Sequence, residues 1–191
     1  MGKGRLEAFS DGVIAILITI MVLELRNPQG FDLSALRPMI PVLLAYVLSF
    51  VVLGIYWNNH HHMFYATERI NGTILWANLH LLFWLSLIPA VTAWIGETRS
   101  APVPTAVYGA VLLMAGAAYY ILTRAIVSCV GPHSAIAIAV GKDVKGKVSV
   151  LLYAVAIPLA FVSPWIADAI YVLVVLMWLV PDRRIESRLT R

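Results

Sequence analysis

Long apolar blocks separated by short polar segments run through the whole chain. A helix needs roughly 20 mainly apolar residues to cross a bilayer, and six blocks come close to that length. The pattern therefore predicts an all-α, polytopic membrane protein whose single domain, residues 1–191, contains six transmembrane helices. The predicted helices cover about residues 6–25, 38–62, 70–95, 104–127, 148–162 and 165–180.

The first block is the most informative, because it joins a polar start to an apolar run. Residues 5–26 read RLEAFSDGVIAILITIMVLELR, and between positions 13 and 23 the one polar side chain is Thr19. Asp11 stands at the edge of this apolar run. An acidic side chain is costly to bury in a bilayer, so it indicates either a functional residue or a paired structural group.

On a helical wheel at about 100° per residue, one narrow stripe of this helix is almost entirely apolar, while Ser10 and Asp11 point away from it. The stripe consists of Gly12, Ile16, Thr19 and Leu23, with Ile20 on its flank. It is either a core or lipid-facing surface, on which Thr19 bonds back to its own helix, or the lining of a pore. In a pore, apolar rings gate by dewetting and hydroxyl oxygens replace part of an ion's hydration shell. The wheel alone leaves both interpretations open.

Composition supports the membrane assignment. Hydrophobic residues make up 61% of the chain and charged residues 13%, whereas about a quarter of a soluble domain is charged. The net charge of +4 does not indicate nucleic-acid binding, because the basic residues flank apolar blocks as they do in membrane proteins.

The single cysteine, Cys129, excludes an internal disulfide. Glu7 and Asp11 favour a mature first helix over a cleaved signal peptide.

Basic residues are unevenly divided between the two sides that six spans create. Of the 14 Lys and Arg residues, eleven fall on the side of the termini and three on the other. An excess of positive charge marks the cytoplasmic side, so both termini are predicted to be cytoplasmic. The eleven are Lys3, Arg5, Arg69, Arg124, Lys142, Lys145, Lys147, Arg183, Arg184, Arg188 and Arg191, and the three are Arg26, Arg37 and Arg99.

Other functional classes fit the sequence less well. The run His60-His61-His62 resembles a metal site, but consecutive helical residues splay by about 100° and do not converge on one ion. We therefore expect a polar network at the membrane edge there, with no metal or other cofactor. A secondary transporter usually carries charged residues at the membrane midplane, and a membrane enzyme needs a nucleophile or metal constellation. Neither pattern is present, so the chain is predicted not to be an enzyme.

Motifs in the first half of the chain resemble those of the transmembrane protein 175 family of cation channels. The first is Arg5-x3-Phe9-Ser10-Asp11, followed by Gly12-Val13-x-Ala15-Ile16-x2-Thr19 and Leu23. Trp57 with His60-His61 at the end of the second block is also similar to the family pattern. So is the third block, which contains Asn78-x3-Leu82-Phe83-x-Leu85-x2-Ile88-Pro89. The second half resembles the family in hydropathy and helix count.

The resemblance implies an architecture and a function. Prokaryotic members have six helices per chain and assemble as tetramers around the first helix, so a homotetrameric potassium channel in a prokaryotic plasma membrane is implied. The resemblance makes Ile16 the apolar constriction and Thr19 a selectivity ring of hydroxyls, with Ile20 and Leu23 continuing the pathway outward. The implied partners are potassium ions, lipid and further copies of the chain.

The resemblance gives the polar motif a structural role. Arg5, Phe9, Ser10 and Asp11 are then expected to hold the first helix against its neighbours rather than to bind ions. Their expected partners are Trp57, His60, His61 and Asn78, because Trp and Asn side chains donate hydrogen bonds to carboxylates. The alternatives to a potassium channel are a proton-permeable or weakly selective cation leak channel, and a non-conducting membrane scaffold or subunit.

Overall fold

The structure is all-helical over the residues it describes. This computed structural model describes residues 2–179 except positions 26, 29, 66, 68, 132, 133, 135, 136, 139, 140 and 142. The α-helices are α1 (Lys3–Ile20), α2 (Ile40–Tyr65), α3 (Gly72–Ser86), α4 (Ile88–Glu97), α5 (Pro102–Val130), α7 (Val144–Leu159) and α8 (Pro164–Leu179). Two 3₁₀ helices, η1 (Met21–Glu24) and η2 (Leu33–Met39), extend the end of α1 and precede α2.

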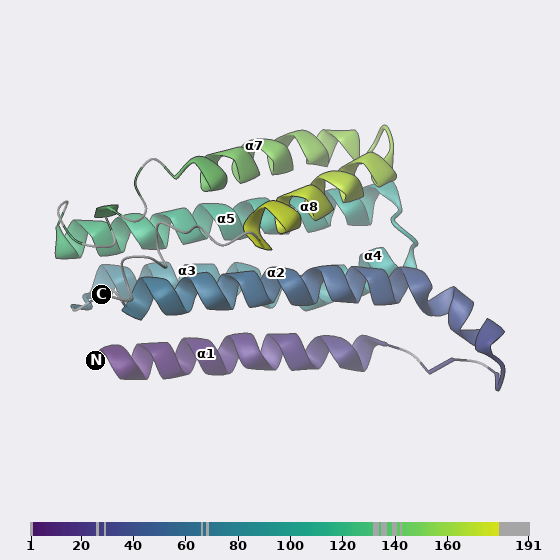
Figure 1. Cartoon of the computed structure of the whole chain (residues 1–191), viewed down its shortest axis with the longest axis horizontal. Helices are drawn as coiled ribbons and strands as arrows, with labels where there is room; N and C mark the ends of the chain where they lie inside the picture. Colours follow the sequence, from purple (N-terminus) through teal and green to yellow (C-terminus); the bar gives the residue numbers. More distant parts are fainter. Residues whose placement is uncertain are drawn as a thin grey trace.

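The long helices lie side by side along the longest axis of the molecule (Figure 1). Helix α1 forms one border of the bundle and packs against α2 and α3, while α7 lies at the opposite border against α5 and α8. Helix α5 is central, because it contacts α3, α4, α7 and α8. The position of α1 at a border leaves one of its faces without a neighbour in the single chain.

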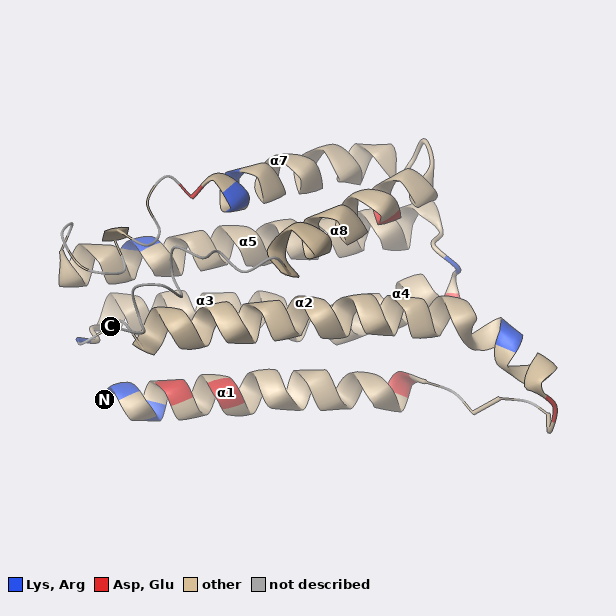
Figure 2. Cartoon of the chain, viewed as in Figure 1, with Lys and Arg blue, Asp and Glu red and all other residues tan. Residues whose placement is uncertain are grey.

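Length and hydropathy make four helical stretches long and apolar enough to cross a membrane: Lys3–Glu24, Leu33–Tyr65, Gly72–Glu97 and Pro102–Val130. Helix α8 is a shorter apolar helix of 16 residues. Charged residues lie mostly toward the two ends of the bundle, and the middle of most helices is uncharged (Figure 2). This distribution is the one a bilayer favours, since a charge near its centre is costly.

Helix boundaries differ from the predicted ones where a local feature decides them. The third predicted span is divided at Leu87 into α3 and α4, because Pro89 has no backbone N–H and its ring clashes with the preceding turn. Helix α7 begins at Val144 rather than near 148, because the Asp143 side chain caps it by accepting a 3.1 Å hydrogen bond from the Gly146 N–H. Outside the described residues lie Arg26, Lys142, Arg183, Arg184, Arg188, Arg191 and the predicted end of the sixth span at Val180.

Candidate functional site

Helix α1 has one buried and one exposed face. Its buried residues recur every three or four positions, as one side of a helix does, and are Leu6, Ser10, Ile14 and Leu17, followed by Met21 in η1. On the opposite face Ile16 is 62% exposed and Leu23 is 77% exposed. Both residues belong to the predicted stripe, as do Gly12 and Thr19, which are also exposed. The stripe is therefore an apolar surface that the single chain leaves uncovered.

The Thr19 hydroxyl bonds back to its own helix. Its Oγ1 lies 3.1 Å from the Ala15 carbonyl oxygen and 3.0 Å from that of Ile16, and it donates to them. A hydroxyl has one proton and two lone pairs, so this donation leaves the oxygen lone pairs available on the exposed side of α1. The geometry gives Thr19 the capacity to accept from water or to coordinate a cation.

A buried chain of hydrogen bonds joins three helices behind the stripe. The His60 Nε2 on α2 lies 2.8 Å from the Asn78 Oδ1 on α3, and the Asn78 Nδ2 donates to the Ser10 Oγ at 2.9 Å. Ser10 in turn donates to the Leu6 carbonyl at 2.9 Å. Because the Asn78 amide oxygen accepts, the proton in the first bond belongs to His60. All three side chains are at most 1% exposed, so their bonded polar atoms rely on one another, and not on water, for hydrogen bonds.

Asp11 has a partner on the neighbouring helix. The Trp57 Nε1–H on α2 donates to the Asp11 Oδ1 at 3.1 Å, and the His61 ring stacks on the Trp57 ring with 6.1 Å between centroids. His61 and His60 therefore point to different neighbours, as their splay on a helix requires. The carboxylate of Asp11 faces α2 and is half-buried.

The other two residues of the motif lie elsewhere on α1. Arg5 is exposed and Phe9 is 47% exposed. Among the described residues, neither belongs to the hydrogen-bond chain that contains Ser10 or to the pair of Asp11 and Trp57. The structure therefore brings Ser10 and Asp11 to α2 and α3 and places Arg5 and Phe9 on the open side.

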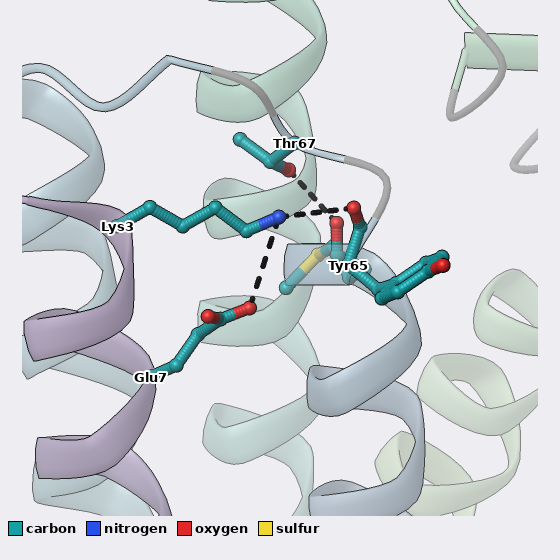
Figure 3. Close-up of polar contacts among 5 residues, drawn as sticks. Lys3, Glu7, Tyr65 and Thr67 are labelled. Atoms are coloured by element: carbon teal, nitrogen blue, oxygen red, sulfur yellow. Dashed lines mark hydrogen bonds and ion pairs between the residues drawn. The ribbon is translucent and has the colours of Figure 1, made fainter.

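A contact that the sequence did not indicate fixes the start of α1. Lys3 extends to the end of α2, where its Nζ donates to the Tyr65 carbonyl oxygen at 3.0 Å and lies 4.0 Å from the Glu7 Oε1 (Figure 3). The same ammonium lies 5.8 Å from the centroid of the Tyr65 ring. A cation near the last carbonyls of a helix is favourable, since these groups have no intrahelical partner. Lys3 thus ties the beginning of α1 to the end of α2.

A second buried polar cluster joins α2, α4 and α5 and was also not predicted. The Thr92 Oγ1 donates to the Ser49 Oγ at 2.6 Å, and the Ser49 Oγ lies 3.0 Å from the Tyr108 hydroxyl. All three residues are at most 5% exposed. Separate Ser, Thr and Tyr residues carry no sequence signal for such a cluster, because it depends on which helix faces pack together.

Comparison with known proteins gives consistent matches. The family model of the endosomal/lysosomal potassium channel TMEM175 matches residues 5–89. A protein of Chryseobacterium sp. (strain P1-3) named as a potassium channel is 52% identical over 189 residues, which cover 99% of this chain and 98% of that relative. The Gallus gallus protein named endosomal/lysosomal proton channel TMEM175 is 35% identical over 112 residues, 51% of this chain and 22% of its own length.

The fold has a counterpart among solved structures. The crystal structure of a homologue of the lysosomal potassium-selective channel TMEM175 from Chamaesiphon minutus matches with a TM-score of 0.80 and 29% sequence identity. The match covers 93% of this chain and 96% of that chain. The family resemblance indicated by the first-helix motif is thereby confirmed along nearly the whole chain. This multi-pass membrane protein belongs to the TMEM175 family.

Proposed function

We propose that this protein is a potassium-permeable cation channel whose pore is lined by α1 from four copies of the chain. The observation that supports this proposal most directly is the uncovered apolar stripe on α1. Ile16 and Leu23 are more than half exposed, while Ile14 on the other face is fully buried. The names of the relatives as potassium channels support the same function. Four copies around one axis would convert the stripe into rings.

The residues of the stripe have distinct proposed roles. Ile16 forms an apolar constriction that gates by dewetting, and Ile20 and Leu23 continue the pathway toward the outer side. Thr19 contributes a ring of hydroxyl oxygens whose lone pairs coordinate partly dehydrated cations. One such ring offers fewer oxygen ligands than a stacked carbonyl filter, so we expect weak to moderate selectivity for potassium over sodium.

The polar motif has a structural role in this proposal. The hydrogen bonds from Asn78 to Ser10 and from Trp57 to Asp11 fix the rotation of α1 about its axis. A helix rotated by one residue, or about 100°, would present different side chains to the pore. We further propose that the protein lies in a prokaryotic plasma membrane with both termini in the cytoplasm.

The direct test is the reversal potential of purified protein in planar bilayers under separate potassium, sodium and proton gradients. A reversal potential near that of potassium, with measurable sodium permeability, is the expected result. Vertebrate relatives are named proton channels, so a reversal potential that follows the proton gradient would favour the proton-permeable alternative. Purified, correctly assembled protein that carries no current would contradict a channel function and favour a scaffold.

A further inference from the structure

A cavity lies away from the α1 stripe, on the other side of α2. It has a volume of about 410 Å³, which is within the range of roughly 300–1,000 Å³ for small-molecule sites. Its walls come from α2, α5, α7 and α8. The residues proposed to line the ion pathway are absent from its walls, so the cavity has no assigned part in conduction.

The lining of the cavity is largely apolar. Val52 and Ile55 line it from α2, and Val174 and Val175 line it from α8. On α5, Gly116 leaves space, because a Cβ atom there would meet only the Tyr56 hydroxyl, at 3.9 Å. A largely apolar wall of this kind suits a hydrocarbon chain, which gains free energy with every methylene that it buries.

The mouth of the cavity carries both signs of charge. Asp143 immediately precedes α7 and Lys147 lies one turn further along it, and both line the cavity together with Asn59 near the end of α2. Trp178 at the same end donates to the Ser149 Oγ at 2.9 Å, and Trp is typical of the membrane–water interface. The polar mouth therefore lies at the bundle end where α2 finishes and α7 begins, toward the membrane surface.

Charge complementarity decides what kind of headgroup fits this mouth. An anionic headgroup would meet the Asp143 carboxylate and a cationic one would meet the Lys147 ammonium. A zwitterionic headgroup places its phosphate toward Lys147 and its ammonium toward Asp143. The carboxylate accepts the Gly146 N–H through one oxygen and retains lone pairs for a second donor.

We propose that this cavity binds a zwitterionic phospholipid of the phosphatidylethanolamine class. One acyl chain lies between α2, α5, α7 and α8, and the aminoethyl phosphate lies between Asp143 and Lys147. Lipid bound there bridges α7 and α8 to α2, and Trp57 in the same part of α2 contacts Asp11 of α1. The proposal concerns lipid binding and does not depend on ion conduction.

The test is native mass spectrometry of the purified full-length protein in detergent, titrated with phosphatidylethanolamine, phosphatidylcholine or phosphatidylglycerol. Gly116→Phe and Val150→Trp each place a large side chain at the cavity wall. The matched control is Leu151→Trp, because Leu151 is 64% exposed on the same helix as Val150 and does not line the cavity. Asp143→Asn keeps a capping side chain for α7, and Lys147→Gln removes the ammonium.

One phosphatidylethanolamine per chain is expected for the wild type. The two filling variants should bind it about tenfold more weakly than Leu151→Trp, the factor expected when two methylenes lose their burial. Asp143→Asn and Lys147→Gln should each weaken binding about threefold, as exposed charge pairs do. Equal lipid binding by the filling variants and the control would overturn the cavity assignment. Tighter binding of phosphatidylglycerol, or no lipid bound to the wild type, would overturn the proposed ligand.

Discussion

Ser10 and Asn78 form a buried polar pair whose groups have no access to water. Ser10→Ala removes the acceptor of the Asn78 Nδ2 and leaves that donor unsatisfied, which costs about 1–3 kcal/mol. We expect a lower unfolding temperature and a smaller fraction of assembled protein in detergent. Ser86→Ala is the control, because Ser86 is exposed and, among the described residues, bonds to its own helix at the Phe83 carbonyl. Equal stability of the two variants would contradict the structural role of Ser10.

Thr19 provides a residue-scale test of ion selection. Thr19→Ala removes the hydroxyl oxygen from the exposed stripe and should lower the permeability ratio of potassium to sodium while conduction continues. Thr19→Ser retains a hydroxyl that can donate to the Ala15 and Ile16 carbonyls, so it should keep most of that ratio. Reversal potentials under mixed potassium and sodium gradients measure the permeability ratio of each variant. An unchanged ratio in Thr19→Ala would show that the hydroxyl ring does not select.

Residue types indicated a polar network where α1 begins and α2 ends, but they did not determine which side chains form hydrogen bonds with each other. A carboxylate and a Trp N–H are complementary, and so are an amide and a hydroxyl, yet which residues meet depends on the rotation of α2 and α3. The Lys3 contact was invisible in the sequence for a different reason. Its acceptor is the Tyr65 backbone carbonyl, and every residue has one.

At the scale of the helix, the two faces of α1 should respond differently to the same substitution. Ile14 is fully buried and Ile16 is 62% exposed. Ile14→Ala leaves a void in the packing against α2 and α3 and should destabilise the fold by roughly 2–5 kcal/mol. Ile16→Ala should leave the unfolding temperature nearly unchanged and raise leak current, because it widens an apolar constriction.

The measurements for this pair are thermal unfolding in detergent and current in planar bilayers. A large loss of stability in Ile16→Ala, without a change in leak, would make the stripe a packing surface. Nearly normal leak in both variants would place the constriction at another residue. The comparison is informative because both substitutions remove the same atoms from residues only two positions apart.

Helix boundaries show which parts of the fold local sequence decides. Apolar block length predicted the extents of α2 and α5 to within a few residues, since both helices are long and apolar enough to cross a membrane. The break between α3 and α4 follows from Pro89, which has no backbone N–H to donate to the preceding turn. The start of α7 was less predictable, because the capping Asp143 adopts a left-handed conformation with φ of 39°, which a hydropathy pattern does not indicate.

At the scale of the whole molecule, the single chain leaves one face of α1 without a packing partner. Its α1 border is apolar, and large exposed apolar surfaces in a membrane protein face lipid, a pore or another subunit. The buried hydrogen bonds behind α1 hold that border in one orientation. In the tetramer proposed above, four such borders would meet around the pore axis.

The orientation of the molecule in the membrane can be tested with single cysteines in a Cys129→Ser background. Lys3 lies at the start of α1, and Phe31, whose side chain is fully exposed, lies between η1 and η2 at the opposite end of the bundle. Cytoplasmic termini predict that a membrane-impermeant maleimide added to intact cells labels Phe31→Cys and leaves Lys3→Cys unlabelled. Permeabilised cells should label both. Labelling of Lys3→Cys but not Phe31→Cys in intact cells would reverse the proposed orientation and place Leu23 at the inner mouth of the pore.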